Sequence, residues 1–265
     1  MSTPLTINPR PCAQGEGTFI STDSQIESVI FERFARQLCQ ERYLFLNGGT
    51  LSAMLTVTSK QIADFASHWP TLTVDRHMGD GGSYRYRRYG EFDAPMGQLR
   101  RQLPHGPYEQ PTYINSLNGG VARLFDPLEP SFVVDPILNR LLNWLTRLYD
   151  QCEGSPRHWN IRLHPYRIVA NPSEAGNPTP EGLHRDGVDY IVSLMVSRCN
   201  VEGGETTITD NQGQVLWQRT LQLPLDIVIG QDARTMHAVS PVTPLRACQP
   251  AWRDVLVIAF TKVES

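Results

Sequence analysis

The sequence lacks the charge balance and the long apolar runs that mark nucleic-acid-binding and membrane proteins. Its 24 Lys and Arg residues are outnumbered by 27 Asp and Glu residues, which gives a net charge of −3 and a pI of about 6.2. A nucleic-acid binder usually carries a basic excess. Strongly apolar segments such as residues 255–260 are far too short to cross a bilayer. We therefore expect neither nucleic acid nor a membrane among the partners.

Cysteine pairs and targeting signals are missing as well. The five cysteines are odd in number and form no CxxC pair, which disfavours a disulfide framework and favours reduced thiols in the cytoplasm. Residues 1–17 are polar and rich in Pro and Gly, without the apolar stretch of a secretory signal. The absence of G-x-G-x-x-G, phosphate-loop and HExxH patterns argues against a dinucleotide fold and against a hydrolytic zinc enzyme.

The chain does contain enough apolar material for a large core. Hydrophobic residues make up 40% of it, with nine Phe, nine Tyr and five Trp. Near the N-terminus, apolar residues recur at helical spacing over residues 24–43, with Asp23 or Ser24 as the N-cap, and a short helix is expected over 59–69. Residues 1–75 are therefore predicted to be mainly helical.

The second half of the chain changes from helical to strand patterns. A helix is predicted over 135–150, where Asp135 is the cap and Pro136 fits the first helical position. Several short segments read as strands, because they are rich in Val, Ile and Leu or because their residues alternate in character from one position to the next. Turn residues separate them. These segments lie at 84–89, 161–170, 188–198, 205–209, 221–230, 236–239 and 254–261. Helices followed by strands predict an α+β fold, mainly β, as a sandwich or barrel with flanking helices.

Three residues stand out as candidate metal ligands. His184 and Asp186 are two positions apart, so in an extended chain their side chains point to the same face. His237 lies at the start of a later predicted strand. Two imidazoles and one carboxylate form the facial triad of non-haem iron(II) oxygenases. The set contains no thiolate, which disfavours a structural zinc site. Taken singly, each could equally be a surface or semi-buried residue.

An arginine near the C-terminus could complete such a site. Arg253 opens the last predicted strand, where its planar guanidinium could bind a carboxylate through two hydrogen bonds. A surface ion pair is the plainer alternative. Arg246 is the competing candidate, but it lies in a Pro-rich loop.

In this order, His184-x-Asp186, His237 and Arg253 resemble the Fe(II)/2-oxoglutarate-dependent dioxygenases. More narrowly, the chain is similar to the bacterial group that contains the free L-isoleucine hydroxylases, over about residues 75–262. The segments that carry this resemblance are Tyr84-Arg85-Tyr86-Arg87-Arg88-Tyr89, Gly119-Gly120-Val121-Ala122-Arg123, Thr179-Pro180-Glu181-Gly182-Leu183-His184-Arg185-Asp186-Gly187, Arg198-Cys199-Asn200-Val201-Glu202-Gly203-Gly204-Glu205 and Trp252-Arg253-Asp254-Val255-Leu256.

The resemblance implies a double-stranded β-helix, a cupin-like jelly-roll, over about residues 76–262, supported by helix 135–150 within a single domain 1–265. It implies that His184, Asp186 and His237 bind Fe(II), and that Arg253 binds the distal carboxylate of the co-substrate 2-oxoglutarate. With O2 as second co-substrate, such an enzyme hydroxylates an unactivated C–H and releases succinate and CO2.

The resemblance also suggests a small-molecule substrate, a free L-amino acid or a close derivative. An amino acid would offer a carboxylate to an arginine and an ammonium group to a carboxylate. We predict Arg167 and Glu181 for these roles, with Arg87 and Arg123 as further arginine candidates. A structural ion pair is an equal alternative for each. The aromatic rings of Trp159, Trp217 and Trp252 are expected to pack in the core.

Two other functions fit the same residues. The first is the same chemistry on a peptide or a natural-product intermediate, which would need an open groove. The second is a non-catalytic, cupin-like metal-binding protein, because a fold does not by itself fix a function. Such a metal binder has no need of a carboxylate-binding Arg253. The sequence gives no indication of the oligomeric state.

Overall fold

In the computed structural model, residues 22–112 and 119–264 are described, so the prediction about residues 1–17 lies outside the described part. The first described element, α1 (Thr22–Glu41), already contains both residues predicted to cap it. It ends before Arg42, whose positive φ of 69° turns the chain into a strand. Among the described residues, no helix is long and apolar enough to cross a membrane.

The N-terminal part contains strands as well as the predicted helices. After α1 come α2 (Gly48–Leu55) and α3 (Ser59–Ala66), and α3 begins at a capping box between Thr58 and Gln61. Between α1 and α2, β1 (Tyr43–Leu46) pairs with β11 (Ile227–Gln231) at one edge of the large sheet. The sequence did not predict β1, because its pairing partner lies far along the chain.

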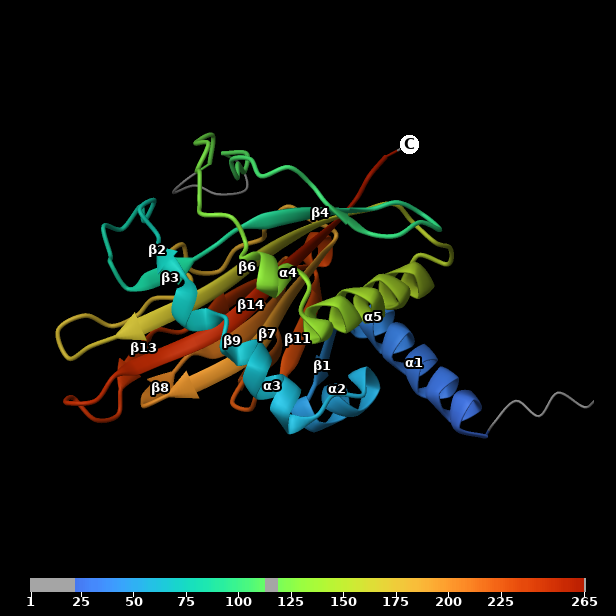
Figure 1. The fold of residues 1–265 in the computed structure, drawn as a ribbon, viewed down its shortest axis with the longest axis horizontal. Coiled ribbons are helices and arrows are strands. Elements are labelled where there is room, and N and C mark those ends of the chain that lie inside the picture. The colour runs from blue at the N-terminus through green and yellow to red at the C-terminus, as the bar shows by residue number, and fades with distance from the viewer. Residues whose placement is uncertain (1–21, 113–118, 265) are drawn as a thin grey trace, which may run out of the picture.

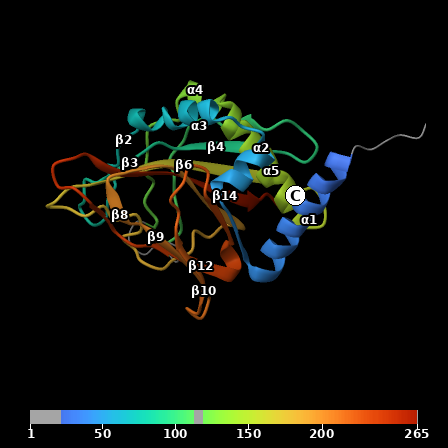
Figure 2. The same ribbon diagram turned by 90° about the horizontal axis from the view of Figure 1, so that it is seen from below.

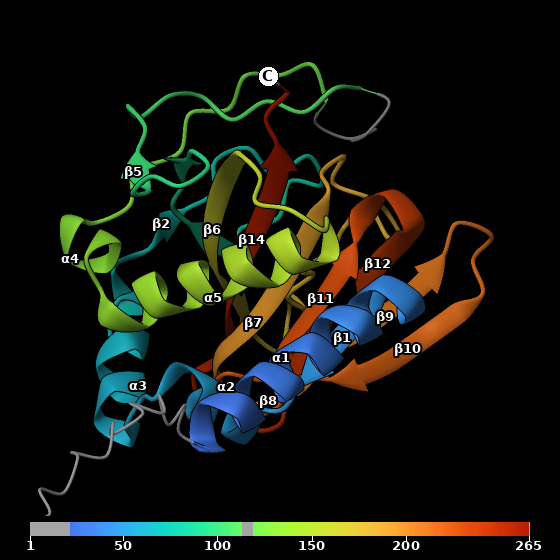
Figure 3. The same cartoon turned by 90° about the vertical axis from the view of Figure 1, so that its right-hand side faces the viewer.

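The predicted helix at 135–150 is confirmed as α5 (Pro136–Cys152), preceded by the short α4 (Pro130–Val133). The Asp135 carboxylate accepts a hydrogen bond from Ile137 N at 2.8 Å, and Pro136 occupies the first turn. Its apolar face is fully buried against the large sheet, where Leu141 and Leu145 share a core with Leu256 of the last strand. Figure 3 shows α5 and α1 lying across one face of this sheet.

The large sheet has nine strands, seven of them in the order β1-β11-β7-β14-β6-β3-β2, while β4 pairs with β5 and β6 (Figure 1). Its remaining strands are β2 (Thr73–Val74), β3 (Arg85–Arg87), β4 (Gly90–Ala94), β5 (Arg101–Gln102), β6 (Trp159–Ala170), β7 (Tyr190–Cys199) and β14 (Ala251–Lys262). Each pair of neighbouring strands in this order is antiparallel. Strands from both halves of the chain therefore build one sheet.

A small sheet faces the large one from the side away from the helices, as Figure 2 shows for α2, α3 and α5. Its order is β10-β9-β12, and β8 pairs separately with β13. These strands are β8 (Val201–Gly203), β9 (Glu205–Asp210), β10 (Val215–Thr220), β12 (Thr235–Val239) and β13 (Val242–Pro244). The two facing antiparallel sheets form the predicted jelly-roll core.

Alternate side chains of the central strand β14 point to opposite faces of the large sheet. Leu256, Ile258 and Phe260 belong to the core beneath the helices. Val255 and Val257 face the space between the two sheets, together with Arg253. Of the three tryptophans expected in the core, Trp159 is fully buried in the helix-side core, and Trp217 is partly buried against the core between the sheets. Trp252 is half-buried outside these cores, with Arg167 over its ring.

Candidate active site

A cavity of about 80 Å³ lies between the two sheets and brings together several of the predicted site residues. It is lined by Arg85, Tyr166, Ile168, Pro178, Thr179, Glu181, His184, Asp186, Ser193, His237, Val239, Arg253, Val255 and Val257. All three candidate metal ligands and Arg253 therefore line one cavity, although His237 and Arg253 are far from the other two in sequence.

His184, Asp186 and His237 form a compact cluster. One ligand atom from each lies within 4.8 Å of the other two, and His237 Nε2 is 3.4 Å from Asp186 Oδ2. His184 is not in a strand as the sequence suggested; it lies in the loop before β7. A β-bridge holds it in place, with His184 N donating to His237 O at 3.0 Å and His237 N donating to His184 O at 2.9 Å. The bridge sets the spacing between the two imidazoles.

Both histidines have a nitrogen suited to a metal. His184 Nδ1 lies 2.9 Å from Gly182 O, and a backbone carbonyl can only accept, so Nδ1 carries the hydrogen and Nε2 is left as a ligand. Burial and, to a smaller extent, the neighbouring His184 lower the pKa of His237 to about 3. His237 is therefore neutral at pH 7, the form that binds metals.

The loop that carries Asp186 is held by Asp232, which the sequence did not single out as functional. The Asp232 carboxylate is 1% exposed and accepts hydrogen bonds from Asp186 N at 3.0 Å, Gly187 N at 2.7 Å and Val188 N at 3.1 Å. Asp232 lies in the short 3-10 helix just before β12. It thereby ties the loop of one candidate ligand to the strand of another, and nothing in its local sequence signals this role.

The Asp186 carboxylate has further support from a buried polar pair. Gln110 Nε2 lies 3.4 Å from Asp186 Oδ1, and Arg123 donates to Gln110 Oε1 at 3.1 Å. Arg123, predicted as a possible substrate-binding arginine, is thus 3% exposed and lies behind the candidate ligand. The long segment 79–120 supplies Gln110, so that this irregular region contributes directly to the site; its residues 113–118 lie outside the described part.

Arg253 is a buried cation that faces the cavity. It is 2% exposed, and among the described residues no partner accepts a hydrogen bond from its Nε or Nη2. Burial lowers the pKa of Arg253 to about 9, with nearby Arg198 adding to the effect, so it is still protonated at pH 7. A buried, unpaired guanidinium is stabilised by a carboxylate ligand that supplies the missing acceptors. Arg246 is exposed and fixed through its backbone to Asn200, outside the cavity lining.

The arginine predicted for the substrate carboxylate needs correction. Arg167 donates to Asp254 through Nε at 2.7 Å and Nη2 at 2.8 Å. It alternates along β6 with Tyr166 and Ile168, which line the cavity, and so points to the opposite face of the sheet. Glu181 does line the cavity, with its Oε1 atom 3.4 Å from His184 Nε2.

The RYRRY segment holds its arginines inside the protein rather than outside. Arg85 and Arg87 are buried in β3 while Tyr86 is half-buried. Arg87 does not line the cavity; it donates to His164 Nδ1 and packs over the Phe125 ring with its Cζ 3.6 Å from the centroid. Arg85 does line the cavity. The alternation in the sequence signals that both arginines share a face, but not which face.

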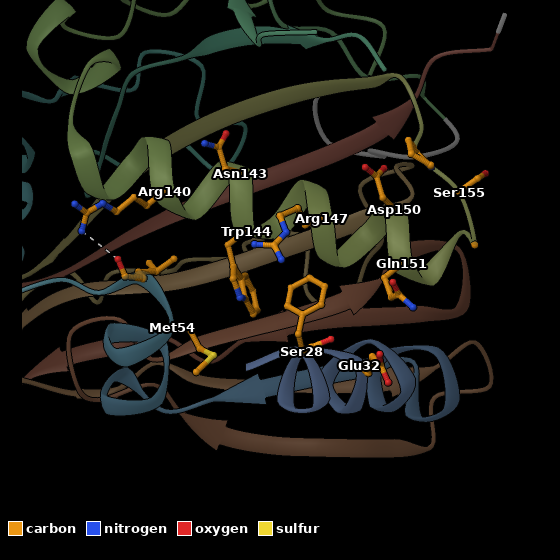
Figure 4. A pocket seen from close by; sticks show the side chains of 14 residues that line it. Ser28, Glu32, Met54, Arg140, Asn143, Trp144, Arg147, Asp150, Gln151 and Ser155 are labelled. Atoms are coloured by element: carbon orange, nitrogen blue, oxygen red, sulfur yellow. Dashed lines mark hydrogen bonds between the residues drawn. The ribbon is translucent and has the colours of Figure 1, made fainter. Parts of the chain in front are cut away.

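A larger groove of about 730 Å³ lies elsewhere, among α1, α2 and α5 (Figure 4). Phe31, Met54 and Trp144 contribute apolar surface to it, and Arg140 at one end donates to Leu55 O at 3.1 Å. It shares no lining residue with the cavity that holds the histidines. Among the described residues, the cluster suited to a metal ion is in the smaller cavity between the sheets.

The chemistry of the small cavity defines a class of protein. Two imidazoles and one carboxylate on one side of a metal leave coordination positions open, which is the ligand set of non-haem iron oxygenases. The unpaired Arg253 in the same cavity fits a second carboxylate-bearing molecule. The donor set and the arginine therefore suit an iron ion together with an oxo-acid co-substrate.

Comparison with known proteins supports this assignment of the site. The profile of the 2OG-Fe dioxygenase family matches residues 66–259, and the chain belongs to this family. It is thus an Fe(II)/2-oxoglutarate-dependent dioxygenase, because the family uses Fe(II), 2-oxoglutarate and O2. A crystal structure of a bsmA homologue from Methylobium petroleophilum PM1 superposes with a TM-score of 0.79 at 32% identity, covering 87% of this chain and 92% of that one.

Two characterised relatives narrow the group. The chain is 28% identical over 162 residues to the 3(1)-hydroxy-L-isoleucine 4-dioxygenase of Pantoea ananatis, a match that covers 60% of this chain and 65% of that protein's length. It is 25% identical over 196 residues to the L-isoleucine-4-hydroxylase of Bacillus thuringiensis, covering 72% of this chain and 79% of that protein. These relatives support the bacterial amino-acid hydroxylase group to which the sequence pointed.

Proposed function

We propose that the protein hydroxylates an unactivated C–H of a free L-amino acid or a close derivative, converting 2-oxoglutarate to succinate and CO2. The observation that carries the co-substrate assignment is Arg253, a buried guanidinium without a partner among the described residues, in the same cavity as the two histidines. The amino-acid assignment is supported by the relatives from Pantoea and Bacillus, whose names place isoleucine or its hydroxylated form as substrate.

In this proposal each part of the cavity has a role. His184, Asp186 and His237 hold Fe(II), and Arg253 binds the distal carboxylate of 2-oxoglutarate. The bound iron, together with 2-oxoglutarate and O2, supplies the oxidising power that replaces C–H by C–OH. The protein supplies orientation: Asp232 holds the backbone of the Asp186 loop, Gln110 contacts the Asp186 carboxylate, and Val255 and Val257 provide an apolar wall.

The setting of the enzyme is part of the proposal. We place it in the cytoplasm as a single domain, with α1, α2 and α3 packed on the core and with no nucleic acid or membrane as partner. The four cysteines in the described residues are unpaired, which suits a reducing compartment. The large sheet includes β1 and β2 from this N-terminal part, which supports a single folding unit.

The test is a screen for substrate-stimulated release of succinate. Purified protein with Fe(II), 2-oxoglutarate and O2 is offered free L-amino acids, short peptides that contain the same residues, and amino-acid derivatives. We expect aliphatic free amino acids to stimulate succinate release and to gain one oxygen atom by mass spectrometry. Stimulation by peptides alone would instead favour the peptide hydroxylase. Tight Fe(II) binding without succinate release under any condition would favour the non-catalytic metal-binding protein.

A further inference from the structure

Arg85 enters the cavity with one side of its guanidinium already occupied. It pairs with Ile168 across β6, and its side chain is 10% exposed. Its Nε donates to Asp75 Oδ2 at 2.8 Å. Among the described residues, no partner accepts a hydrogen bond from its two terminal nitrogens. These nitrogens form the fork that binds a carboxylate.

Arg85 shares its one ion-pair partner with a second arginine. Asp75 is fully buried, and Arg87 Nη1 lies 3.8 Å from the Asp75 Oδ2 atom that Arg85 contacts. The other carboxylate near Arg85, that of Glu181, lines the same cavity and acts on Arg85 through space, without an ion-pair contact. The terminal nitrogens of a buried guanidinium in this position are stabilised by an anion that enters the cavity. The α-carboxylate of an amino acid meets this requirement.

Glu181 supplies the opposite charge in the same cavity. The Glu181 side chain is 20% exposed. Its carboxylate lies 3.4 Å from His184 Nε2, and His184 is its one ion-pair partner in the described structure. If His184 Nε2 binds the metal, as the proposed function requires, it has no hydrogen left for Glu181. The Glu181 carboxylate then lines the cavity without an ion-pair contact among the described residues, and an ammonium group beside it would be stabilised.

We infer that Arg85 and Glu181 together bind the two charged ends of a zwitterionic substrate, Arg85 the α-carboxylate and Glu181 the α-ammonium. This inference rests on the proposed function and adds a specificity rule to it. The enzyme requires both charges on one small molecule, so residues inside a peptide chain, which carry neither charge, are excluded. The pair replaces the predicted combination of Arg167 with Glu181, because Arg167 is bound to Asp254 on the other face of β6.

The experiment compares variants with substrate analogues. Wild type, Arg85→Gln and Glu181→Gln are loaded with Fe(II) and 2-oxoglutarate without O2, and binding of the best amino acid from the screen is measured by calorimetry. The same amino acid is then replaced by its amide, which lacks the carboxylate, and by its 2-hydroxy acid, which lacks the ammonium. Arg246→Gln serves as the matched control, because Arg246 is exposed and outside the cavity.

We expect each variant to lose one preference only. Arg85→Gln weakens amino-acid binding roughly 10- to 100-fold and no longer distinguishes acid from amide. Glu181→Gln weakens it to a similar extent and no longer distinguishes the amino acid from the 2-hydroxy acid. Arg85→Lys, which keeps the charge without the fork, recovers part of the loss. Circular dichroism spectra and melting profiles of all variants, compared with those of wild type and Arg246→Gln, check that the fold is intact.

Two results would overturn the inference. In the first, the wild type binds and hydroxylates the amino acid, while both variants keep its affinity or lose affinity for all analogues equally. The assignment of Arg85 and Glu181 to the two charges is then wrong, and the proposed function stands. In the second, no free amino acid binds to the wild type or stimulates its succinate release, while a peptide does. Both the roles of Arg85 and Glu181 and the amino-acid assignment are then wrong. A selective loss in the two variants supports both.

Discussion

Arg253 and Asp254 are neighbours on β14 that point to opposite faces of the large sheet. Arg253 lines the cavity between the sheets, without a partner for its Nε and Nη2 among the described residues. Asp254 is 1% exposed on the other face, where it binds Arg167 and accepts from Ser197 Oγ at 2.8 Å. The ion pair anchors β14 at the residue next to Arg253. A residue with a structural role and a candidate binding residue are therefore adjacent in the chain.

Replacing Arg253 tests the co-substrate site. We expect Arg253→Gln to raise the 2-oxoglutarate concentration needed for half-maximal succinate release by roughly 100-fold, because the amide cannot provide the charged, two-pronged contact. Iron affinity should change little. Arg246→Gln is the control and should behave as wild type. An unchanged 2-oxoglutarate requirement in the Arg253 variant would rule out the assignment.

Removing a histidine tests the metal site. His237→Ala should abolish both Fe(II) binding and succinate release while leaving the melting profile near that of the metal-free wild type. Anaerobic addition of Fe(II) and 2-oxoglutarate should give the wild type a weak visible charge-transfer band, and this band should be missing in the variant. Succinate release by the variant at the wild-type rate would disprove the ligand assignment.

Asp232 should tune iron affinity without touching the metal. Asp232→Asn replaces one acceptor oxygen by an NH2 group that faces backbone N–H donors, so the Asp186 loop loses its fixed position. We expect Fe(II) affinity to fall roughly 10- to 100-fold, as for other partners that orient ligands. Asp210→Asn is a matched control, because Asp210 likewise accepts backbone N–H bonds, from Gln212 and Gln214, in a turn outside the cavity lining. Equal effects of both changes on iron affinity would contradict the role.

Breaking the Arg167–Asp254 pair should affect stability. Asp254→Ala leaves Arg167 and Ser197 without their acceptor and is expected to lower the free energy of unfolding by about 3 kcal/mol. Arg167→Met should cost at least as much, because it leaves the Asp254 carboxylate, which is 1% exposed, without its cation. In urea titrations the double variant should lose less than the sum of the single losses. Full additivity would mean that the two residues do not interact.

His164 should make stability depend on pH. Burial lowers the pKa of His164 well below its usual value, and Arg87, which donates to its Nδ1, lowers it further. Because the unfolded chain binds a proton at ordinary histidine pKa and the folded chain does not, this contribution to stability is present above about pH 6.5 and is lost as the pH falls below it. Between pH 7 and pH 5, one such histidine lowers stability by about 2 kcal/mol.

The matching variant is His164→Gln, which keeps an acceptor for Arg87 but cannot titrate. Urea titrations of the metal-free protein at pH 7 and pH 5 should show a smaller loss of stability in the variant than in the wild type. The sign follows from the lowered pKa: acid favours the unfolded state. Equal losses in both proteins would show that His164 titrates normally in the folded state.

Features that depend on residues close together in the sequence could be predicted, whereas features that depend on residues far apart in the sequence could not. The cap of α5 at Asp135 is local and was predicted to the residue. The candidate ligands were recognised because His184 and Asp186 are close in sequence. β1 could not be predicted, because its pairing with β11 is a long-range contact. Arg167 was misplaced for another reason: the sequence shows that alternate residues of β6 share a face, but not which face lines the cavity.

The roles of Asp232 and Gln110 were hidden for the same physical reason. A carboxylate that accepts three backbone N–H bonds from a distant loop looks in sequence like any other Asp in a turn. Gln110 comes from a segment without periodic pattern, and its relation to Asp186 exists only in the folded chain.

The β-bridge between His184 and His237 has a consequence for which ion the protein carries. Because backbone hydrogen bonds hold His184 and His237 side by side, the two histidine ligands are already close together before a metal binds. A site of two nitrogens and one oxygen follows the general order of divalent affinities, in which cobalt, nickel and copper bind more tightly than ferrous iron. Selection of iron then falls to the metal supply of the cell, and protein purified on a nickel column would emerge with its catalytic position blocked until a chelator cleared it.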